Sequence, residues 1–471
     1  MLVLKRWLQA RNAPATKKPA ICWLFCLSLI IFFTFSTQTH ALSIPDARHL
    51  LARTGFDPVW KEIEPLLPLT REQAVDLIVN KASTRPLQRI PAYLLSTPED
   101  SHELMMSRSE VERKAAQKIE RERLEVLQSW WIEQMIATPT PLAEQMTLFW
   151  HSHFSSSIQK VRTTRVMAQQ HLTLRTHALG NFSDFLLAII HDPAMLRYLD
   201  AANNRKAQPN ENFARELLEL FSLGVGNYTE QDIKEASRAF SGWTVNRERA
   251  SFYFNEREHD NEDKTFFEQT GNFTGDDIVH IILEQPATAQ FITTKLWKQF
   301  ISEIPNTARI QTIAKKWQEE DVYAIKPLLK ALFNSSDFWA TENRGRLIKS
   351  PVDYVVGLLR VWKMPNQHNH QWRNSISILG QDLFNPPNVK GWEGGTNWIT
   401  TNTLVVREQI MQKFLHDAGG MRTKNLPESW NAPTEKLWRE VLLALPPSNS
   451  TDDRPEQQLE AWLLDPVFQV K

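Results

Sequence analysis

Residues 209–245 constrain the fold most strongly, because they have the pattern of two helices joined by a tight, glycine-bearing turn. Apolar side chains recur at the spacing of one helix face between Asn210, which is a suitable N-cap, and Gly224, which is a typical helix stop. Thr229 and Asp232 then have the spacing of a capping box at the start of a second helix. A chain organised around this pair is expected to be mainly α-helical.

Most of the remaining chain shows the same helical periodicity, and only residues 251–254 and 265–267 have the composition of short strands. These two stretches flank a charged segment around His259 and together suggest one β-hairpin. Residues 379–407 are rich in Pro, Gly and Trp, which indicates a long irregular loop. The predicted fold is mainly α, with a multi-helix globular body, a small β-hairpin insertion and a long Pro/Gly/Trp-rich loop.

Residues 1–41 have the three parts of an export signal: a basic start, an apolar run from Ile21 to Phe35, and a small residue at Ala41. The run is shorter than the roughly 20 residues that a membrane-spanning helix needs. We therefore expect cleavage after Ala41 and a periplasmic or extracellular protein, with an uncleaved N-terminal membrane anchor as the alternative. The expected domains are a signal peptide at 1–41, a helical domain at 42–410 that allows two subdomains split near 245–275, and a C-terminal helical extension at 411–471.

Charge and cysteine content exclude several classes of site in the mature chain. Five of the 54 basic residues and none of the 54 acidic residues lie in the signal, which leaves 49 against 54 and a net charge of −5. This balance does not suggest a nucleic acid as partner. Both cysteines, Cys22 and Cys26, lie in the signal, so cleavage would leave no cysteine for disulfides, thiol chemistry or metal binding.

Histidines and carboxylates in separate motifs supply the candidates for chemistry. His151 and His153 form a His-Ser-His segment at the end of a predicted helix, and Glu216 lies at the edge of the buried face of the first helix in 209–245. The candidate catalytic residues are His151, Glu216, His259 and Asp260. Without cysteine, a metal would need imidazole and carboxylate ligands, so the candidate metal ligands are His151, His153, Glu216 and His259, for a divalent ion such as zinc, manganese or iron.

Three of these residues also have a structural interpretation. Two imidazoles two residues apart on a helix diverge by about 200°, so His151 and His153 could share an ion only if the backbone left the helix there. The alternative is a pair of neutral, hydrogen-bonded histidines. For Glu216 the alternative is an ion pair with Arg238 on the facing helix. No Gly-x-Ser-x-Gly, His-Glu-x-x-His or phosphate-binding glycine motif occurs in the chain.

The long loop supplies most of the candidates for ligand binding. Its glycines and prolines force an irregular backbone, and loops with such dense aromatic and polar content are often functional. The alternative is a tryptophan-rich lid packed on the helical body. The candidate ligand-binding residues are Arg215, Trp243, Lys264, Lys390, Trp392, Asn397 and Trp398.

In order along the chain, several motifs together resemble one bacterial family of exported proteins, catalogued as domain of unknown function number eighteen hundred. The motifs are Phe149-Trp-His-Ser-His-Phe154, Asp192-Pro-Ala-Met-Leu196, residues 209–243, His259-Asp260 with Lys264, Lys349-Ser-Pro351 and residues 386–398. The resemblance runs from about residue 46 to 410. It departs at Ser152, where the family has His-Asn-His, and the family carries no established catalytic residues to transfer.

The resemblance implies an exported protein with a possible partner. Genes of this family commonly neighbour those of a second exported family, number fifteen hundred and one, which is similar to the alkaline phosphatase and sulfatase superfamily. Two functions therefore stay open: a binding or assembly partner of such a sulfatase- or phosphatase-like protein, or an exported enzyme, possibly metal-dependent, with a His/carboxylate site. No stable membrane span is expected after signal cleavage.

Overall fold

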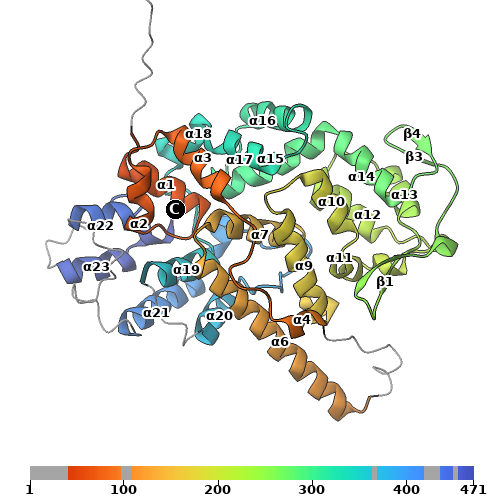
Figure 1. Ribbon diagram of the computed structural model, residues 1–471, viewed down its shortest axis with the longest axis horizontal. Coiled ribbons are helices and arrows are strands. Elements are labelled where there is room, and N and C mark those ends of the chain that lie inside the picture. Colours follow the sequence, from red (N-terminus) through yellow and green to blue (C-terminus); the bar gives the residue numbers. More distant parts are fainter. Residues whose placement is uncertain (1–40, 97–107, 363–368, 418–434, 449–454) are drawn as a thin grey trace, which may run out of the picture. The chain divides into compact units, whose positions relative to one another are not determined.

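The computed structural model describes residues 41–96, 108–362, 369–417, 435–448 and 455–471, so all but the last residue of the predicted signal lies outside the described part (Figure 1). The described chain begins with α1 (Ile44–Thr54), α2 (Trp60–Ile63), the 3-10 helix η1 (Glu64–Leu66), α3 (Arg71–Lys81), α4 (Ala92–Ser96), α6 (Glu110–Ala137), α7 (Pro141–His153), α8 (Ile158–Val161), α9 (Thr164–His177), α10 (Phe182–Ile190), α11 (Pro193–Tyr198) and η2 (Ala201–Asn203).

The central part holds the helix pair predicted from the sequence and all the named strands. It consists of α12 (Asn212–Glu216), the π-helix η3 (Leu217–Ser222), α13 (Glu230–Ala239), β1 (Trp243–Asn246), β2 (Ser251–Phe254), η4 (Glu256–Glu258), β3 (Lys264–Phe266) and β4 (Gln269–Gly271).

The last part is again helical. It consists of α14 (Gly275–Glu284), α15 (Pro286–Phe300), α16 (Thr307–Glu319), α17 (Ile325–Phe333), α18 (Ser336–Trp339), η5 (Thr341–Asn343), α19 (Pro351–Trp362), α20 (Asn369–Ile378), η7 (Gly395–Trp398), α21 (Thr401–Asp417), α22 (Glu435–Leu442), α23 (Pro455–Leu464) and η10 (Pro466–Gln469). The fold is mainly α with small antiparallel β elements, as predicted.

Helix starts follow the local capping chemistry. Thr229 accepts a hydrogen bond from the Asp232 amide at 3.1 Å, and the Asp232 carboxylate accepts one from the Thr229 amide at 2.8 Å, which completes the predicted capping box of α13. Asn210 accepts from the Asn212 amide at 3.0 Å at the start of α12. Gly224 has a φ of +81°, a left-handed conformation that ends the helix after η3.

The predicted single hairpin is wrong in its pairing, because the two predicted strands belong to two different hairpins. β2 pairs with β1, with Trp243 opposite Phe254, and β3 pairs with β4, with Phe266 opposite Gln269. Phe267 and Glu268 both have positive φ, as a two-residue type I′ turn requires. Each strand therefore pairs with its nearest neighbour in sequence, which closes a shorter loop than the predicted pairing would.

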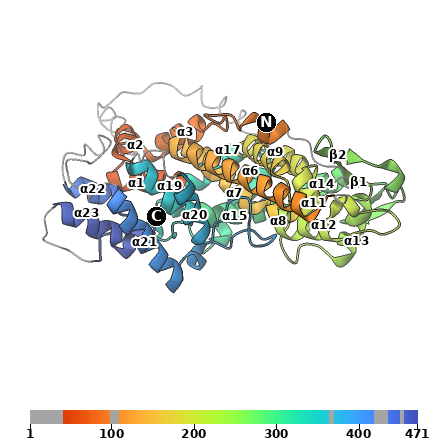
Figure 2. The ribbon, with the colours of Figure 1, turned by 90° about the horizontal axis from the view of Figure 1, so that it is seen from below.

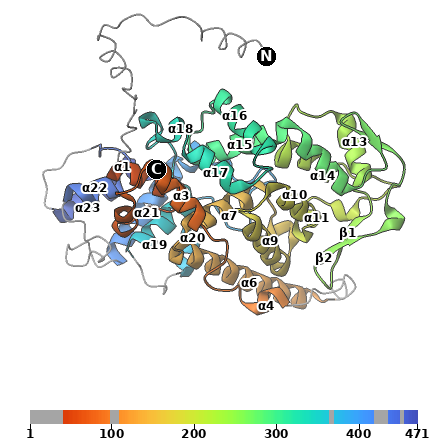
Figure 3. The ribbon, with the colours of Figure 1, turned by 45° about the horizontal axis from the view of Figure 1, so that its top comes forward.

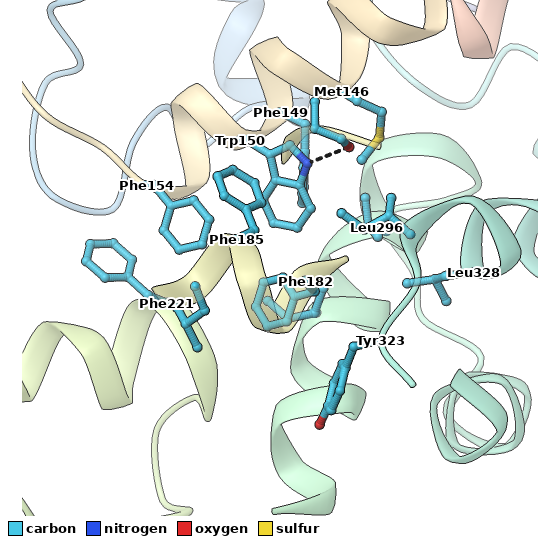
Figure 4. Close-up of a cluster of buried hydrophobic side chains, with 14 of the residues drawn as sticks. Met146, Phe149, Trp150, Phe154, Phe182, Phe185, Phe221, Leu296, Tyr323 and Leu328 are labelled. Atoms are coloured by element: carbon cyan, nitrogen blue, oxygen red, sulfur yellow. Dashed lines mark hydrogen bonds between the residues drawn. The ribbon is translucent and has the colours of Figure 1, made fainter. Parts of the chain in front are cut away.

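Two hydrophobic clusters form the core. The larger one is built from residues of α1, α3, α7 and α9 to α18, and Figure 4 shows its aromatic part around Trp150, Phe154, Phe182 and Phe185. The Trp150 indole N–H donates to the Ala178 carbonyl at 3.1 Å, so this buried polar group is satisfied. The second cluster joins the apolar end of α6 with α19, α20, α21 and α23.

Segments distant in sequence meet at α1. α22 packs against α1, and α23 contacts both α21 and α22 (Figure 2). The β1–β2 hairpin lies at the other end of the described body, beside α11 (Figure 3). The boundary predicted at residue 410 falls inside α21, and the proposed domain division stays a prediction.

Buried charges hold the chain end in the core. Lys471 Nζ lies 2.7 Å from Asp353 Oδ2, and Lys349 Nζ lies 2.7 Å from Asp57 Oδ2, with all four residues buried.

Among the described residues, no helix has both the length and the apolar character that crossing a bilayer requires.

Candidate functional site

The His-Ser-His segment lies inside α7, which continues to His153 before the chain leaves the helix. Both histidines are buried. Because the helix is intact, their rings point in different directions. The His151 ring contacts Trp131, Phe384 and Trp392, whereas the His153 ring contacts Phe154 and Phe221. The backbone break that shared ligation would need comes after the second histidine.

His151 is a neutral hydrogen-bond acceptor. Its Nε2 accepts from the Phe384 amide at 3.0 Å, so the proton of the neutral ring is on Nδ1, which has no hydrogen-bond partner among the described residues. Burial lowers the pKa of His151 to about 3, so the ring is uncharged at neutral pH. This histidine connects α7 to the start of the long loop.

His153 connects α7 to the π-helix η3. Its Nε2 donates to the Phe221 carbonyl at 3.1 Å, and burial, aided by the positive charge of Lys295, lowers its pKa well below the usual range. The π winding is visible in the Leu223 amide, which donates to the Leu218 carbonyl five residues earlier at 3.0 Å. Such segments interrupt the ordinary helical ladder and often occur at functional sites.

Glu216 lies directly before η3 and makes no ion pair with any described residue. The alternative partner considered from the sequence, Arg238, is bound elsewhere. Burial and the neighbouring Glu219 raise the pKa of Glu216, against the opposing effects of Arg215 and Lys390. Glu216 is therefore a half-buried acid within electrostatic reach of the long loop.

The candidates around His259 form a separate cluster that holds a loop onto α13. His259 Nδ1 lies 2.9 Å from the Ser241 carbonyl. Asp260 accepts two hydrogen bonds from Arg238, at 2.7 and 3.2 Å. Although burial would raise the pKa of Asp260, its hydrogen bonds, those from Arg238 above all, lower it. Lys264 Nζ donates to the carbonyls of Asp260 and Glu262 and to the Asn272 side chain.

Two further candidates have structural partners. Arg215 binds Glu230 through two hydrogen bonds of 2.8 Å and also contacts Glu211 at 3.2 Å. Trp243 is buried against the rings of His191 and Phe240.

The predicted metal ligands are not gathered at one place. Among the described residues, no group of three or more His, Cys, Asp or Glu side chains is arranged to hold a metal ion. His151 and His153 use their Nε2 atoms in hydrogen bonds to the backbone on different sides of α7. His259 uses its Nδ1 at Ser241. The metal hypothesis stays a prediction from the sequence without support from this geometry.

The long Pro/Gly/Trp-rich loop rests on the end of α7. Besides the bond between His151 and Phe384, the Phe384 carbonyl accepts from the Ile158 amide at 2.9 Å, and Ser157 Oγ donates to Asn385 Oδ1 at 2.7 Å. The Trp392 amide donates to Ser152 Oγ at 3.3 Å. Two of these four bonds reach α7, at His151 and Ser152, and two reach the start of α8, at Ser157 and Ile158. The loop is thus a positioned element instead of a free connector.

Three of the predicted ligand-binding residues line one groove of about 320 Å³. They are Trp392, Asn397 and Trp398. The remaining walls come from the same loop and from the adjacent ends of α20 and α21: Ile378, Leu379, Gly380, Pro387, Asn388, Glu393, Gly394 and Thr403. The Trp392 indole N–H is buried and has no hydrogen-bond partner among the described residues. Lys390 is exposed beside the groove and is not among its described walls.

Comparison with known proteins assigns the sequence to a family. A family model described as "Protein of unknown function (DUF1800)" matches residues 49–470. The chain belongs to the DUF1800 family. No curated protein and no solved structure matches it. The family membership expected from the motifs is confirmed, and the match extends past residue 410 into the C-terminal helices.

Sequence reasoning missed one residue central to this DUF1800 fold. His171 in α9 packs against Trp131 and Phe384, the same rings that His151 contacts, and neither of its buried nitrogens has a partner among the described residues. Burial is the main cause of its strongly lowered pKa. It occurs singly in a helical stretch, so only its placement on the apolar face of that helix could have indicated it.

Proposed function

We propose that this DUF1800 protein is a non-catalytic binding protein, and that its groove takes an apolar segment of an exported sulfatase- or phosphatase-like partner. The observation that carries the proposal is the groove around Trp392, Asn397 and Trp398, formed by a loop that four hydrogen bonds fix to the end of α7 and the start of α8. A preorganised aromatic groove loses little conformational entropy on binding.

The groove walls have the chemistry of a protein-binding site. Tryptophan side chains provide large contact areas and are frequent binding hot spots. Ile378 is 66% exposed on one wall, and Leu404 and Val405, the next residues after Thr403 along α21, are 45% and 50% exposed. These exposed apolar groups extend the groove over a wider surface than a small ligand requires. Asn397 is exposed in the groove and can supply a polar contact that fixes the orientation of a bound segment.

If the protein is an enzyme, its candidate catalytic residues should lie together in one site. The described walls of the groove include none of the candidate catalytic residues His151, Glu216, His259 and Asp260. Buried neutral histidines whose Nε2 atoms already bind the backbone are poorly placed for proton transfer to a substrate. The binding interpretation therefore agrees better with the side-chain geometry.

We also propose that the protein is exported and begins at Leu42 after cleavage. The composition of residues 1–41 supports this. The Leu42 amide donates to the Leu69 carbonyl at 2.9 Å, and the α-amino group that cleavage would create can still donate that hydrogen bond. N-terminal sequencing of protein recovered from outside the cytoplasm should begin at Leu42, and an intact Met1 on membrane-bound protein would establish the anchor instead.

The partner hypothesis is tested with purified proteins. Immobilised wild-type protein is titrated with the sulfatase- or phosphatase-like protein exported by the same bacterium. Trp398→Ala should weaken binding by at least about tenfold, because truncation of an aromatic hot spot typically costs about 1.4 kcal/mol or more. Tyr253→Ala is the matched control, because Tyr253 is an exposed aromatic residue on the distant β1–β2 hairpin. No binding by the wild type, or equal loss in both variants, contradicts the proposal.

A further inference from the structure

A second cavity, separate from the groove, is lined by arginines from three parts of the chain. It has a volume of about 180 Å³ and lies between α1, the segment after η5, and α22 with the residues that follow it. Arg48 comes from α1, Arg344 follows η5, and Arg439 comes from α22. We call it the arginine cavity. It shares no described lining residue with the groove.

The charges of these arginines are incompletely matched. Arg48 is buried and donates from Nε to the Val441 carbonyl at 3.1 Å and from one Nη to the Leu442 carbonyl at 3.0 Å, at the C-terminal end of α22. Its other Nη makes no hydrogen bond with a described residue. Arg439 makes neither a hydrogen bond nor an ion pair through its side chain with any described residue.

The guanidinium of Arg344 is also only partly satisfied by neighbouring groups. One of its Nη atoms binds Asp46, a carboxylate that Arg71 also contacts at 3.0 Å, and its Nε is buried without a partner among the described residues. Glu440 is the one carboxylate among the described lining residues, against three guanidinium groups. A guanidinium stays charged in proteins, so these groups cannot relieve the cost of burial by losing a proton.

Further charges lie near the cavity. Arg53 is a cation within electrostatic range of the lining residue His49, and its guanidinium donates to the carbonyls of Phe300 and Ile301. The charges of Asp57 and Asp353 act on Arg48 and Arg53 from a distance, and neither carboxylate makes a direct hydrogen bond to these arginines among the described residues. His49 also lines the cavity, and its pKa is lowered mainly by burial and then by the charges of Arg53, Arg344 and Arg48. The ring is therefore uncharged and adds no positive charge of its own.

We propose that the arginine cavity binds a small tetrahedral oxyanion of the phosphate or sulfate class, held by Arg48, Arg344 and Arg439. Guanidinium groups bind such oxyanions through directed, charge-assisted hydrogen bonds. One arginine can satisfy a planar carboxylate, whereas three arginines from separate elements match an anion with several oxygens and two charges. The volume is below the roughly 300 Å³ at which pockets for larger organic ligands begin. The remaining walls, Pro45, Leu443, Ala444, Leu445 and Pro446, are apolar and offer no competing hydrogen-bonding side chain.

Calorimetric titration of the purified full-length protein with sodium phosphate and with sodium sulfate tests this proposal. Sodium chloride and sodium acetate at equal ionic strength are the controls, and thermal unfolding is followed in each salt. Phosphate and sulfate should bind and raise the unfolding temperature beyond the effect of chloride, and acetate should not. Equal effects of all four salts would show that only general screening occurs and would overturn the proposal.

Arg439→Gln is the decisive variant, because the Arg439 side chain contacts no described residue through a hydrogen bond or ion pair and its replacement should leave folding intact in chloride. It should weaken phosphate binding by at least tenfold. Arg121→Gln, on the exposed part of α6, is the matched control and should bind like the wild type. Ala444→Glu places a carboxylate in the cavity and should abolish phosphate binding. Wild-type affinity in both Arg439→Gln and Ala444→Glu would overturn the proposal.

Discussion

His151 and His153 each combine ring packing with a hydrogen bond to the backbone. His151 and His153 occupy positions where a short His-x-His motif suggested metal binding, yet each uses its Nε2 to bind a backbone group of a different neighbouring element. An imidazole combines an aromatic surface with a directed hydrogen bond, which suits it to hold a loop on one side of a helix and a π-helix on the other. The sequence marks these two histidines as unusual, but it does not show which backbone groups they bind.

Glu216 gives a prediction at the same scale. Because its pKa is raised in the folded protein, chiefly by burial, the charged form destabilises the fold at neutral pH. Glu216→Gln should therefore raise the unfolding temperature at pH 7. The gain should shrink as pH falls through the raised folded pKa and disappear below the unfolded value of about 4.3.

Glu230 supplies the control of opposite sign. Hydrogen bonds from Arg215 lower its pKa, so the stability it provides is present above the unfolded pKa and is lost as pH falls through the folded pKa. Glu230→Gln should lower the unfolding temperature at pH 7. A loss of stability in Glu216→Gln comparable to that in Glu230→Gln would show that Glu216 has a structural partner after all.

At the scale of elements, the long loop depends on its approach to α7. Gly391 has a φ of +79°, and a Cβ there would overlap the Ser152 carbonyl oxygen and Oγ. Gly391→Ala should cost about 2–5 kcal/mol, because strain of the left-handed conformation adds to the clash with the backbone of the helix.

Gly226→Ala separates the cost of backbone strain at positive φ from the cost of the steric clash at Gly391. Gly226 has a φ of +87° and no atom within 4 Å of an added Cβ, so its substitution should cost only about 1–2 kcal/mol from backbone strain. Urea unfolding of both variants measures the difference. If Gly391→Ala costs no more than Gly226→Ala, the loop is not held against α7 as described.

Elements were predictable from the sequence where local interactions define them. The capping box at Thr229, the helix stop at Gly224 and the irregular loop are set by neighbouring residues, and all three occur in the structure. The pairing of β2 with β1 and the π winding of η3 were not predicted. Strand pairing depends on which partner is nearest, and η3 depends on tertiary contacts such as the bond from His153 to Phe221.

The candidate site was predictable to a similar extent. Trp392, Asn397 and Trp398 were selected because they are dense in one loop, and they line one groove. Glu216 and His259 were grouped with His151 by residue type alone, and the fold gives each a different surrounding. The arginine cavity could not be predicted, because Arg48, Arg344 and Arg439 lie far apart in the sequence and no local pattern connects them.

At the scale of the whole molecule, buried ion pairs connect the first, middle and last parts of the chain. Asp353 in α19 is bound by Lys471 at 2.7 Å and by the Gln145 side chain at 2.6 Å. Burial alone would raise the pKa of Asp353, but Lys471, Gln145 and the Ser350 amide lower it. The stability from Asp353 is thus present above the unfolded pKa of about 3.9 and is lost as pH falls through the lowered folded pKa.

Replacing Lys471 should show how much the fold depends on this connection. Lys471→Met leaves Asp353 buried without its cation, so it should cost about 3–5 kcal/mol in urea unfolding at pH 7. Lys114→Met is the control: its pair with Glu110 has the same 2.7 Å separation but is exposed, so it should cost at most about 1 kcal/mol. Adding Asp353→Asn to Lys471→Met should recover part of the loss, because the double variant contains no stranded charge. If Lys471→Met and Lys114→Met lower the free energy of unfolding equally, burial does not strengthen the ion pair between Lys471 and Asp353.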